Sequence, residues 1–441
     1  MTPIVAIVGR PNVGKSTLFN RLAGRRLAIV HDAPGVTRDR HYAGAVLHGR
    51  ELTLIDTGGF DPTSDDPMGR GIARHVQAAI EEADVVVCVL DGTAPPTAPD
   101  RDAVGLLRRA QKPTVYAANK VDSEALRAES SGLYELGVTD IIPISALHGR
   151  GIGELCASIT AQLPPPDTDP APMTPDGTPR VALVGRPNAG KSSLLNHLAG
   201  AERALVDERP GTTRDPIDSQ VDYAGHHYLV VDTAGIRRRS KVGEGVESLS
   251  VIRAIRSMER ADVVVLMCDA KGGLAEQDAR LVGLCAERGR ALVVGMNKVD
   301  LLGQREVKAA LDDARRGLHF APWAPIVPLS VKQGIGLEKL MRAVRRAATE
   351  FRHRVPTAEL NRFFDQVIAH HPPPTSGGRA PRVYYVTQAQ TAPPVFVAMS
   401  NAPHHIRKSY RRYLTNQIRE AFGFGSVPLR VQFRRRSQRE R

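Results

Sequence analysis

Short apolar runs alternate with segments of helical spacing over most of this chain. The first series of runs comprises Ile4 to Val8, Leu52 to Ile55, Asp84 to Asp91, Pro113 to Ala118 and Ile141 to Ile144, and a second series starts at Val181 to Val184. Apolar runs of this length between helical segments are typical of strands that are buried inside parallel sheets. The pattern predicts an α/β protein with two mostly parallel sheets, each flanked by helices.

The pattern changes near Pro356. From there the spacing predicts an α-β-β-α-β order, with a helix over Ala358 to His370, strands over Val383 to Gln390 and Val395 to Asn401, a basic helix over Ile406 to Phe422 and a last strand over Leu429 to Phe433. A Pro-rich stretch between the two repeated halves predicts an extended, semi-rigid linker. We therefore predict domains over 1–164, 179–352 and 353–441, with the linker over 165–178.

Composition supports several domains and locates the charge. The chain has 441 residues, too many for one core, with 42% hydrophobic and 24% charged residues and a net charge of +13. Residues 351–441 hold 16 Lys and Arg against 4 Asp and Glu, so nearly all of the net charge lies in the last fifth of the chain. This asymmetry favours a nucleic-acid partner over the alternative, a merely solvated charged surface.

Cysteine usage and the N-terminus bear on the compartment. The four cysteines are scattered without the spacing of metal ligands, and Cys88 and Cys268 lie in Val-rich runs, where we expect small buried hydrophobes. The chain enters a strand at once and has no apolar run long enough to cross a bilayer. We expect a cytoplasmic protein with no membrane span.

Two phosphate-binding loops follow the first strands of the two halves. They consist of Gly9, Arg10, Pro11, Asn12, Val13, Gly14, Lys15 and Ser16, and of Gly185, Arg186, Pro187, Asn188, Ala189, Gly190, Lys191 and Ser192. The glycines let backbone N–H groups turn toward the β- and γ-phosphates, the lysine brings its ammonium to the same oxygens, and the serine hydroxyl can ligate Mg²⁺. Two copies in the same strand–loop–helix context make a chance match negligible.

Switch motifs follow each loop. Thr37 and Thr213 lie in PGxTRD segments, where a threonine can ligate Mg²⁺ and sense the γ-phosphate. A strand ending in Asp-x-x-Gly comes next, so that the aspartate can hold Mg²⁺ through water and the last glycine can reach the γ-phosphate. The two segments are Asp56, Thr57, Gly58, Gly59 and Phe60, and Asp232, Thr233, Ala234, Gly235 and Ile236. The predicted Mg²⁺ ligands are Ser16, Thr37 and Asp56, and Ser192, Thr213 and Asp232.

Two further motifs select guanine. The aspartate of Asn-Lys-x-Asp can accept the N1–H and 2-amino groups of guanine, which adenine does not offer, and a later Ser-Ala pair covers the O6 edge. The residues are Asn119, Lys120, Val121, Asp122, Ser145 and Ala146, and Asn297, Lys298, Val299, Asp300, Ser330 and Val331. Val331 replaces the small residue expected at its position, and we expect guanine binding to survive. The predicted nucleotide is GTP or GDP.

The order of these motifs resembles the EngA/Der family of double GTPases involved in ribosome assembly, over essentially the full length. GRPNVGKS, GRPNAGKS, the PGxTRD segments, DTAGIRRR at 232–239 and SYRRYL at 409–414 carry the resemblance. It implies two Ras-like G domains and a C-terminal KH-like domain. It also implies hydrolysis of GTP and association with the maturing large (50S) ribosomal subunit and its rRNA.

Catalysis is expected to be slow, because Phe60 and Ile236 stand where Ras-like GTPases place a water-orienting glutamine. In related GTPases with this loop pattern, the amide at the position of Asn12 or Asn188 helps to hold K⁺ near the phosphates. We predict K⁺-stimulated turnover, with Lys15, Asn12, Thr37, Lys191, Asn188 and Thr213 as the catalytic set; the alternative is that both asparagines only cap the loop. For Arg237, Arg238 and Arg239 we keep two alternatives. They face phosphate, or they lie on a solvated or RNA-facing surface.

The C-terminal region has no GxxG loop of the kind that KH modules use to clamp a nucleic-acid backbone. We expect phosphate contacts from Arg407, Lys408, Arg411, Arg412, Arg434, Arg435, Arg436 and Arg439. Tyr410 and Tyr413 are predicted to pack in the core, with stacking on bases as the alternative. The protein is expected to be a monomeric ribosome assembly factor. The alternatives are an RNA-binding scaffold in which one G domain only senses nucleotide, and the GTPase subunit of an RNA-modification complex.

Overall fold

The computed structural model describes residues 2–24, 42–57, 76–77, 79–123, 126, 130–165, 177–200, 218–233, 247–374 and 381–435. The chain forms two compact units, one of Met1–Ala171 with Gly243–Arg256 and one of Pro172–Val242 with Ser257–Arg441. The second unit therefore contains both the second G-domain sheet and the C-terminal domain. Among the described helices, none combines the length and the hydrophobicity that crossing a bilayer requires.

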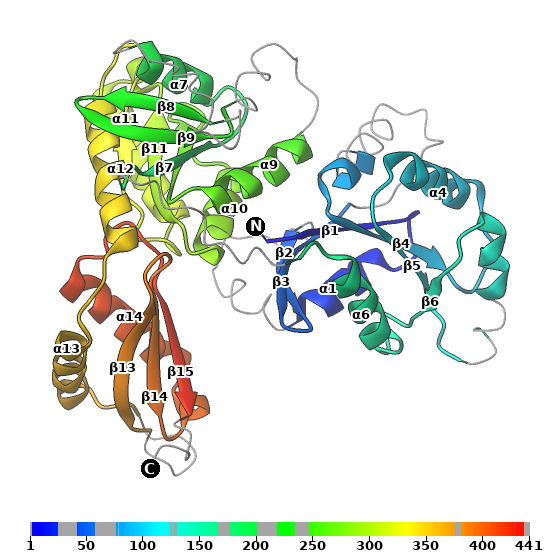
Figure 1. The fold of residues 1–441 in the computed structure, drawn as a ribbon. Helices are drawn as coiled ribbons and strands as arrows, with labels where there is room; N and C mark the ends of the chain where they lie inside the picture. Colours follow the sequence, from blue (N-terminus) through cyan, green and yellow to red (C-terminus); the bar gives the residue numbers. More distant parts are fainter. Residues whose placement is uncertain are drawn as a thin grey trace. The chain divides into compact units, whose positions relative to one another are not determined.

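The first G domain is built on a six-stranded sheet in the order β2-β3-β1-β4-β5-β6, in which only β2 runs antiparallel to its neighbour (Figure 1). Its elements are β1 Ile4–Val8, α1 Lys15–Ala23, β2 Tyr42–Leu47, β3 Arg50–Asp56, β4 Val85–Asp91, α4 Ala98–Ala110, β5 Thr114–Asn119, η2 Ser130–Leu136, β6 Ile141–Pro143 and α6 Ile152–Gln162.

Both faces of this sheet are buried, which is why its strands are continuous apolar runs. Val5 and Ile7 of β1 lie in a core cluster with residues of α1 and α6. Ile4 and Ala6 lie in a second cluster with residues of α4 and of the segment 76–83. The alternation of strand side chains thus distributes the apolar residues between two layers of helices.

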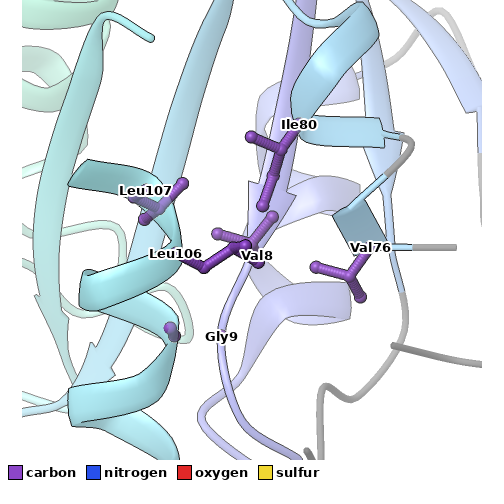
Figure 2. Close-up of a pocket in the computed structure, with 7 residues that line it drawn as sticks. Val8, Gly9, Val76, Ile80, Leu106 and Leu107 are labelled. Carbon is purple, nitrogen blue, oxygen red and sulfur yellow. The ribbon is translucent and has the colours of Figure 1, made fainter. Parts of the chain in front are cut away.

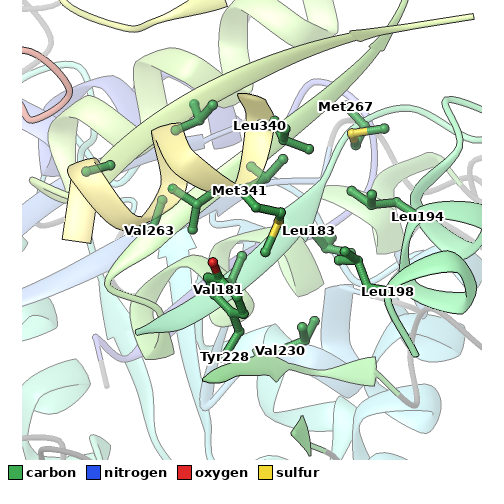
Figure 3. Close-up of a cluster of buried hydrophobic side chains, with 14 of the residues drawn as sticks. Val181, Leu183, Leu194, Leu198, Tyr228, Val230, Val263, Met267, Leu340 and Met341 are labelled. Carbon is green, nitrogen blue, oxygen red and sulfur yellow. The ribbon is translucent and has the colours of Figure 1, made fainter. Parts of the chain in front are cut away.

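The second G domain repeats this topology with strand order β12-β11-β10-β7-β9-β8 and an antiparallel β8. Its elements are β7 Arg180–Val184, α7 Lys191–Gly200, β8 Ser219–Tyr223, β9 His226–Val231, α9 Glu247–Arg260, β10 Val263–Asp269, α10 Glu276–Glu287, β11 Ala291–Asn297, η3 Val299–Leu301, α11 Gln304–Gly317, β12 Ile326–Pro328 and α12 Leu337–Arg352. Figure 3 shows the core between the sheet and two helices, where Leu194 and Leu198 of α7 and Leu340 and Met341 of α12 meet the strands.

The C-terminal domain has a three-stranded sheet in the order β13-β14-β15, with β13 antiparallel and β15 parallel to the central strand. Its elements are α13 Thr357–His370, β13 Val383–Gln390, β14 Val395–Ser400, η4 Pro403–His405, α14 Lys408–Phe422 and β15 Arg430–Arg435. The predicted α-β-β-α-β order is confirmed. The basic helix begins two residues later than expected because Ile406 and Arg407 have extended backbone after the 3₁₀ turn at 403–405.

The C-terminal domain completes the core of the second G domain. Val427, which follows α14, is fully buried in the cluster that contains the strands of that domain. The Leu292 amide of β11 donates to the Ser426 carbonyl oxygen at 2.9 Å, and the Arg419 guanidinium lies 5.6 Å from the ring centroid of Trp323. The segment around Val427 thus docks the C-terminal domain on the second G domain, while the rest of the C-terminal core, from Val355 to Phe424, forms a cluster of its own.

Candidate functional site

The two phosphate loops have the same backbone shape. Asn12 and Asn188 adopt left-handed φ values of 64° and 59°, and Gly14 and Gly190 follow with φ of 94° and 103°. A Cβ atom at Gly14 would collide with the Asn119 side chain, and one at Gly190 would collide with that of Asn297. Glycine is therefore required where each loop approaches the base-binding segment, and the loop N–H groups can turn inward, as a phosphate cradle needs.

The lysine of each phosphate loop forms hydrogen bonds with carbonyl oxygens of that loop. Lys15 Nζ donates to the Arg10 carbonyl oxygen at 2.7 Å, and Lys191 Nζ donates to the Gly185 and Arg186 carbonyl oxygens at 2.8 and 2.6 Å. Burial lowers the pKa of Lys15 to about 8, against the opposing charge of Asp56. Each ammonium is thus held by carbonyl oxygens of its own loop, from which it can transfer to phosphate oxygens when nucleotide binds.

Hard oxygen donors for Mg²⁺ lie together in the first domain. Ser16 Oγ donates to Asp56 Oδ2 at 2.8 Å, and Asp56 is buried with 3% of its surface exposed. Mg²⁺ prefers oxygen ligands of this type and is usually bound through one or two protein groups plus phosphate oxygens and water. The residues present therefore fit the ion that the motif implies.

In the second domain the corresponding aspartate is held differently. Asp232 Oδ2 accepts a hydrogen bond from Ser257 Oγ of α9 at 2.9 Å. The backbone N–H of Asp232 donates to Asp218 Oδ1 at 3.1 Å. Arg260 in turn pairs with Asp218 at 2.8 Å. The carboxylate is present and its donor set still suits Mg²⁺, but a helix side chain engages it.

The guanine-binding segments are tied to the phosphate loops by their asparagines. Asn119 Nδ2 donates to the Val13 carbonyl oxygen at 2.7 Å, and its Oδ1 accepts the Ala146 N–H at 2.9 Å. In the second domain, Asn297 donates to Ala189 O at 2.9 Å and accepts the Val331 N–H at 3.0 Å. Because the backbone N–H of Val331 makes the same contact as that of Ala146, the larger side chain does not alter this arrangement.

The specificity carboxylates and lysines complete the base side of each site. Lys120 and Lys298 adopt left-handed φ values of 71° and 67°. Lys120 pairs with Asp91 at 2.7 Å and Lys298 with Asp269 at 2.6 Å. Burial opposes ionisation of both aspartates, but hydrogen bonds from these lysines and from neighbouring groups outweigh it, so each pKa lies below the usual value. The Asp122 side chain is exposed, as a group that receives a base must be.

Several predicted site residues lie outside the described part of the chain. These are Thr37, Gly58, Gly59, Phe60, Thr213, Ala234, Gly235 and Ile236, together with Arg237, Arg238 and Arg239, linker residues 166–176 and the tail residues Arg436 and Arg439. The structure brings together the remaining predicted residues of each site at the carboxyl ends of the parallel strands, where ligands of open α/β sheets bind.

A small pocket lies beside Gly9, the first residue of the first phosphate loop (Figure 2). Apolar side chains of Val8, Val76, Ile80, Ala103, Leu106 and Leu107 line it beside Gly9. It offers no polar side chain to a ligand, so it is not the nucleotide site. It separates the start of the loop from α4 and from the segment around residue 80.

Sequence reasoning missed four carboxylates around these sites. Asp91, Asp100, Asp269 and Asp278 contact the loop arginines or the base-side lysines. The one available signal was the capping-box pattern of Thr97 and Asp100, which marks a helix start but not its partner in space. Cys88 and Cys268, by contrast, are free and buried as expected, Cys156 and Cys285 are free and buried too, and burial raises the pKa of Cys88 to about 12.

The basic C-terminal helix uses part of its charge internally. Arg411 donates to the Ile406 and Pro403 carbonyl oxygens at 3.1 and 2.7 Å and lies 4.9 Å from the ring centroid of Phe433. Tyr410 is buried and donates to the His371 carbonyl oxygen at 2.7 Å. Tyr410 therefore belongs to the core, and Arg411 is committed to its own domain. Arg407, Arg412, Arg434 and Arg435 are exposed.

Two sheets with phosphate loops, Mg²⁺ donors and guanine-selective segments at their strand ends define a tandem guanine-nucleotide-binding protein. The family model described as "50S ribosome-binding GTPase" matches residues 4–120 and 180–298. The model described as "KH-domain-like of EngA bacterial GTPase enzymes, C-terminal" matches residues 354–434.

Full-length relatives agree. The chain is 45% identical to GTPase Der of Myxococcus xanthus over 99% of this chain and 96% of that one. It is 44% identical to GTPase Der of Syntrophotalea carbinolica over 99% of this chain and all of that one. The chain belongs to the Der family, and it is a GTP-hydrolysing enzyme with two G domains and a KH-like domain.

Proposed function

We propose that this enzyme uses GTP binding and hydrolysis to control its docking on, and release from, the maturing large ribosomal subunit. The observation that carries the proposal is the direct contact between the second G domain and the basic C-terminal domain, made by buried Val427, by the Leu292–Ser426 hydrogen bond and by Arg419 beside Trp323. A nucleotide-dependent change in that G domain would reach the basic domain through these contacts. The ribosomal terms in the name of the matching family model support the choice of partner.

Within each site, we propose that the loop lysine and N–H groups contact the β- and γ-phosphates, that Ser16, Thr37 and Asp56 or their counterparts Ser192, Thr213 and Asp232 hold Mg²⁺, and that Asp122 and Asp300 select guanine. The exposed arginines Arg407, Arg412, Arg434 and Arg435 make sequence-independent contacts with rRNA phosphates. Bound Mg²⁺ would offset the negative charge that builds up on the phosphates.

Co-sedimentation with large ribosomal subunits tests the docking proposal. The full chain is compared with GDP and with a non-hydrolysable GTP analogue, beside Arg412→Gln/Arg435→Gln and the control Arg305→Gln, which removes an exposed arginine of α11. Truncation of the C-terminal domain is unsuitable because it would open the core around Val427. We expect association with the analogue only, weakened in the double variant and unchanged in the control. Equal association in both nucleotide states would overturn the proposal.

We further propose that K⁺ stimulates turnover through Asn12 and Asn188. Both side chains are exposed at the tip of their loops, and neither makes a hydrogen bond with the described residues, so neither caps the loop there. A monovalent cation held by such an amide would add positive charge where the transition state gains negative charge. GTP hydrolysis should be faster in KCl than in NaCl, and equal rates in the two salts would contradict this assignment.

A further inference from the structure

Each G domain contains the same buried ion pair behind its phosphate loop. Arg10 Nε lies 3.3 Å from Asp100 Oδ2, and Arg186 Nε lies 2.9 Å from Asp278 Oδ2. Asp100 is 2% exposed and Asp278 is fully buried. The arginine is the second residue of the loop motif, whereas the aspartate lies in the first turn of α4 or α10, some ninety residues later in the chain. The protein therefore builds this contact twice.

The aspartate also organises the start of its helix. Asp100 Oδ2 accepts from Thr97 N at 2.9 Å and from Thr97 Oγ1 at 2.6 Å, and Asp278 Oδ2 accepts from Ala275 N at 3.0 Å. These are the contacts of the third helical residue in a capping box. The oxygen that caps the helix is the same oxygen that meets the arginine, so the helix start and the phosphate loop are fixed to one atom.

This arrangement carries an energetic cost that a helix cap alone does not require. The second carboxylate oxygens, Asp100 Oδ1 and Asp278 Oδ1, are buried and have no hydrogen-bond partner among the described residues. Removing a carboxylate from water costs several kcal/mol, which a single ion pair offsets only in part. An exposed capping residue would serve the helix at lower cost, which points to a role for the charge pair in the loop.

The arginine connects the pair to the reacting groups through its own backbone. The Arg10 carbonyl oxygen accepts from Lys15 Nζ at 2.7 Å, and the Arg186 carbonyl oxygen accepts from Lys191 Nζ at 2.6 Å. The side chain of the arginine is thus anchored to the helix while its backbone holds the catalytic lysine.

We propose that Arg10 with Asp100, and Arg186 with Asp278, are positioning residues for GTP hydrolysis. Each pair fixes the phosphate-loop backbone against the helix that follows β4 or β10, so that the lysine and the loop N–H groups meet the phosphates in register. The arginines act through the aspartates rather than by touching nucleotide. The inference rests on the GTPase chemistry and is independent of the proposed ribosomal partner.

The test uses the full chain with Lys191→Ala, so that only the first site turns over. Arg10→Gln, Asp100→Asn and their double variant are compared with Asp102→Asn, a matched control on an exposed carboxylate of the same helix. Asparagine keeps the acceptor for Thr97 while removing the charge. The measurements are the single-turnover rate at saturating GTP, expressed per nucleotide-occupied site, and the GDP affinity.

We expect each single variant to lose about tenfold in rate per occupied site, the size of effect that outer-shell positioning groups have elsewhere. The double variant should be no slower than Arg10→Gln, because that change already breaks the link to Asp100 together with the 3.4 Å contact between Arg10 and Asp91. The Asp102→Asn rate should stay within about twofold of the parent.

Two outcomes would overturn the inference. Losses that multiply in the double variant would mean that Arg10 and Asp100 act independently, with Arg10 acting through Asp91 or on the nucleotide itself. An unchanged rate per occupied site, with only a lower melting temperature, would reduce the pair to a structural contact. The second domain offers an independent repeat, with Asp278→Asn and the exposed control Glu276→Gln in a Lys15→Ala background.

Discussion

The two G domains carry the same series of motifs apart from Val331 in place of Ala146, yet the aspartate predicted to hold Mg²⁺ has different partners in the two. In the first domain Asp56 Oδ2 accepts from Ser16 Oγ at 2.8 Å, so the two predicted metal ligands already face each other. In the second, Asp232 Oδ2 accepts from Ser257 Oγ of α9 at 2.9 Å, and Asp232 has a left-handed φ of 57°. The motifs therefore define which oxygen atoms are available to bind Mg²⁺. In the second domain, a side chain of α9 forms a hydrogen bond with one of these oxygens.

The charge networks beside the two loops differ as well. Arg10 reaches Asp91 at 3.4 Å in addition to Asp100, and Asp91 also pairs with Lys120 of the guanine-binding segment. Arg186 instead donates to the Gly273 carbonyl oxygen at 2.9 Å. A continuous line of charges thus joins the phosphate and base sides of the first site. The second site is built from the same residue types in two separate pairs.

The largest expected effect tests whether both sites are catalytic. Lys15→Ala and Lys191→Ala each remove an ammonium that faces the phosphates, and loss of one such stabilising group costs about 10²- to 10³-fold in rate. Single-turnover hydrolysis with GTP at one equivalent per site measures the two phases. If either variant retains the full amplitude and rate of GTP hydrolysis, the domain that carries the substitution binds nucleotide without hydrolysing it. The molecule would then combine one catalytic G domain with one that only senses nucleotide.

The next prediction compares the stability of the two G domains. It uses Val427, which the C-terminal domain contributes to the core of the second G domain. Val427→Ala removes two buried methyl groups and should cost about 2 kcal/mol of unfolding free energy. Trp323 is the only tryptophan and lies beside Arg419, so its fluorescence during urea unfolding reports on this unit. Val46→Ala, at an exposed position of the first domain, should leave that transition in place.

A third prediction concerns pH at the first site. Burial lowers the pKa of Lys15 to about 8, whereas nucleotide phosphates favour its charged form. GDP affinity should therefore be constant below pH 8 and fall by up to about tenfold per pH unit above it. Affinity would be measured in the Lys191→Ala chain, with proton uptake followed in buffers of different ionisation enthalpy.

The sign of the stability change provides a check on that prediction. The folded pKa of Lys15 lies below its unfolded value of 10.5, so the unfolded chain binds more protons between about pH 8 and 10.5. The contribution of Lys15 to the stability of the nucleotide-free protein should rise over this range while GDP affinity falls. Parallel trends would show that a different group titrates.

The sequence predicted the parts of the molecule that depend on local pattern. The strand before each phosphate loop, the presence of a helix after it, and the order of elements in the C-terminal domain all follow from apolar runs and glycine positions. Contacts such as Arg10 with Asp100 could not be predicted, because they join residues far apart in the chain and leave no periodic signal. Arg411 shows the same limit, since its charge suggested RNA while its partners are carbonyl groups and a ring of its own domain.

The smallest predicted effect tests the different hydrogen-bond partners of Asp56 and Asp232 directly. Ser257→Ala removes the hydroxyl that engages Asp232, and a hydrogen bond of this kind contributes about 1 kcal/mol, or roughly fivefold in an equilibrium. Binding of a GTP analogue to the second site should then saturate at about fivefold lower Mg²⁺. The measurement is a Mg²⁺ titration in the Lys15→Ala chain.

Ser219→Ala is the matched control, since that hydroxyl contacts Thr233 at 2.9 Å, one residue beyond Asp232. An unchanged Mg²⁺ requirement in Ser257→Ala would mean that the serine follows the carboxylate without competing for it. A shift in Ser257→Ala alone would mean that α9 sets the metal affinity of the second site. Asp56 of the first site accepts instead from Ser16, at the start of α1, so the two domains would then respond to the same Mg²⁺ concentration differently.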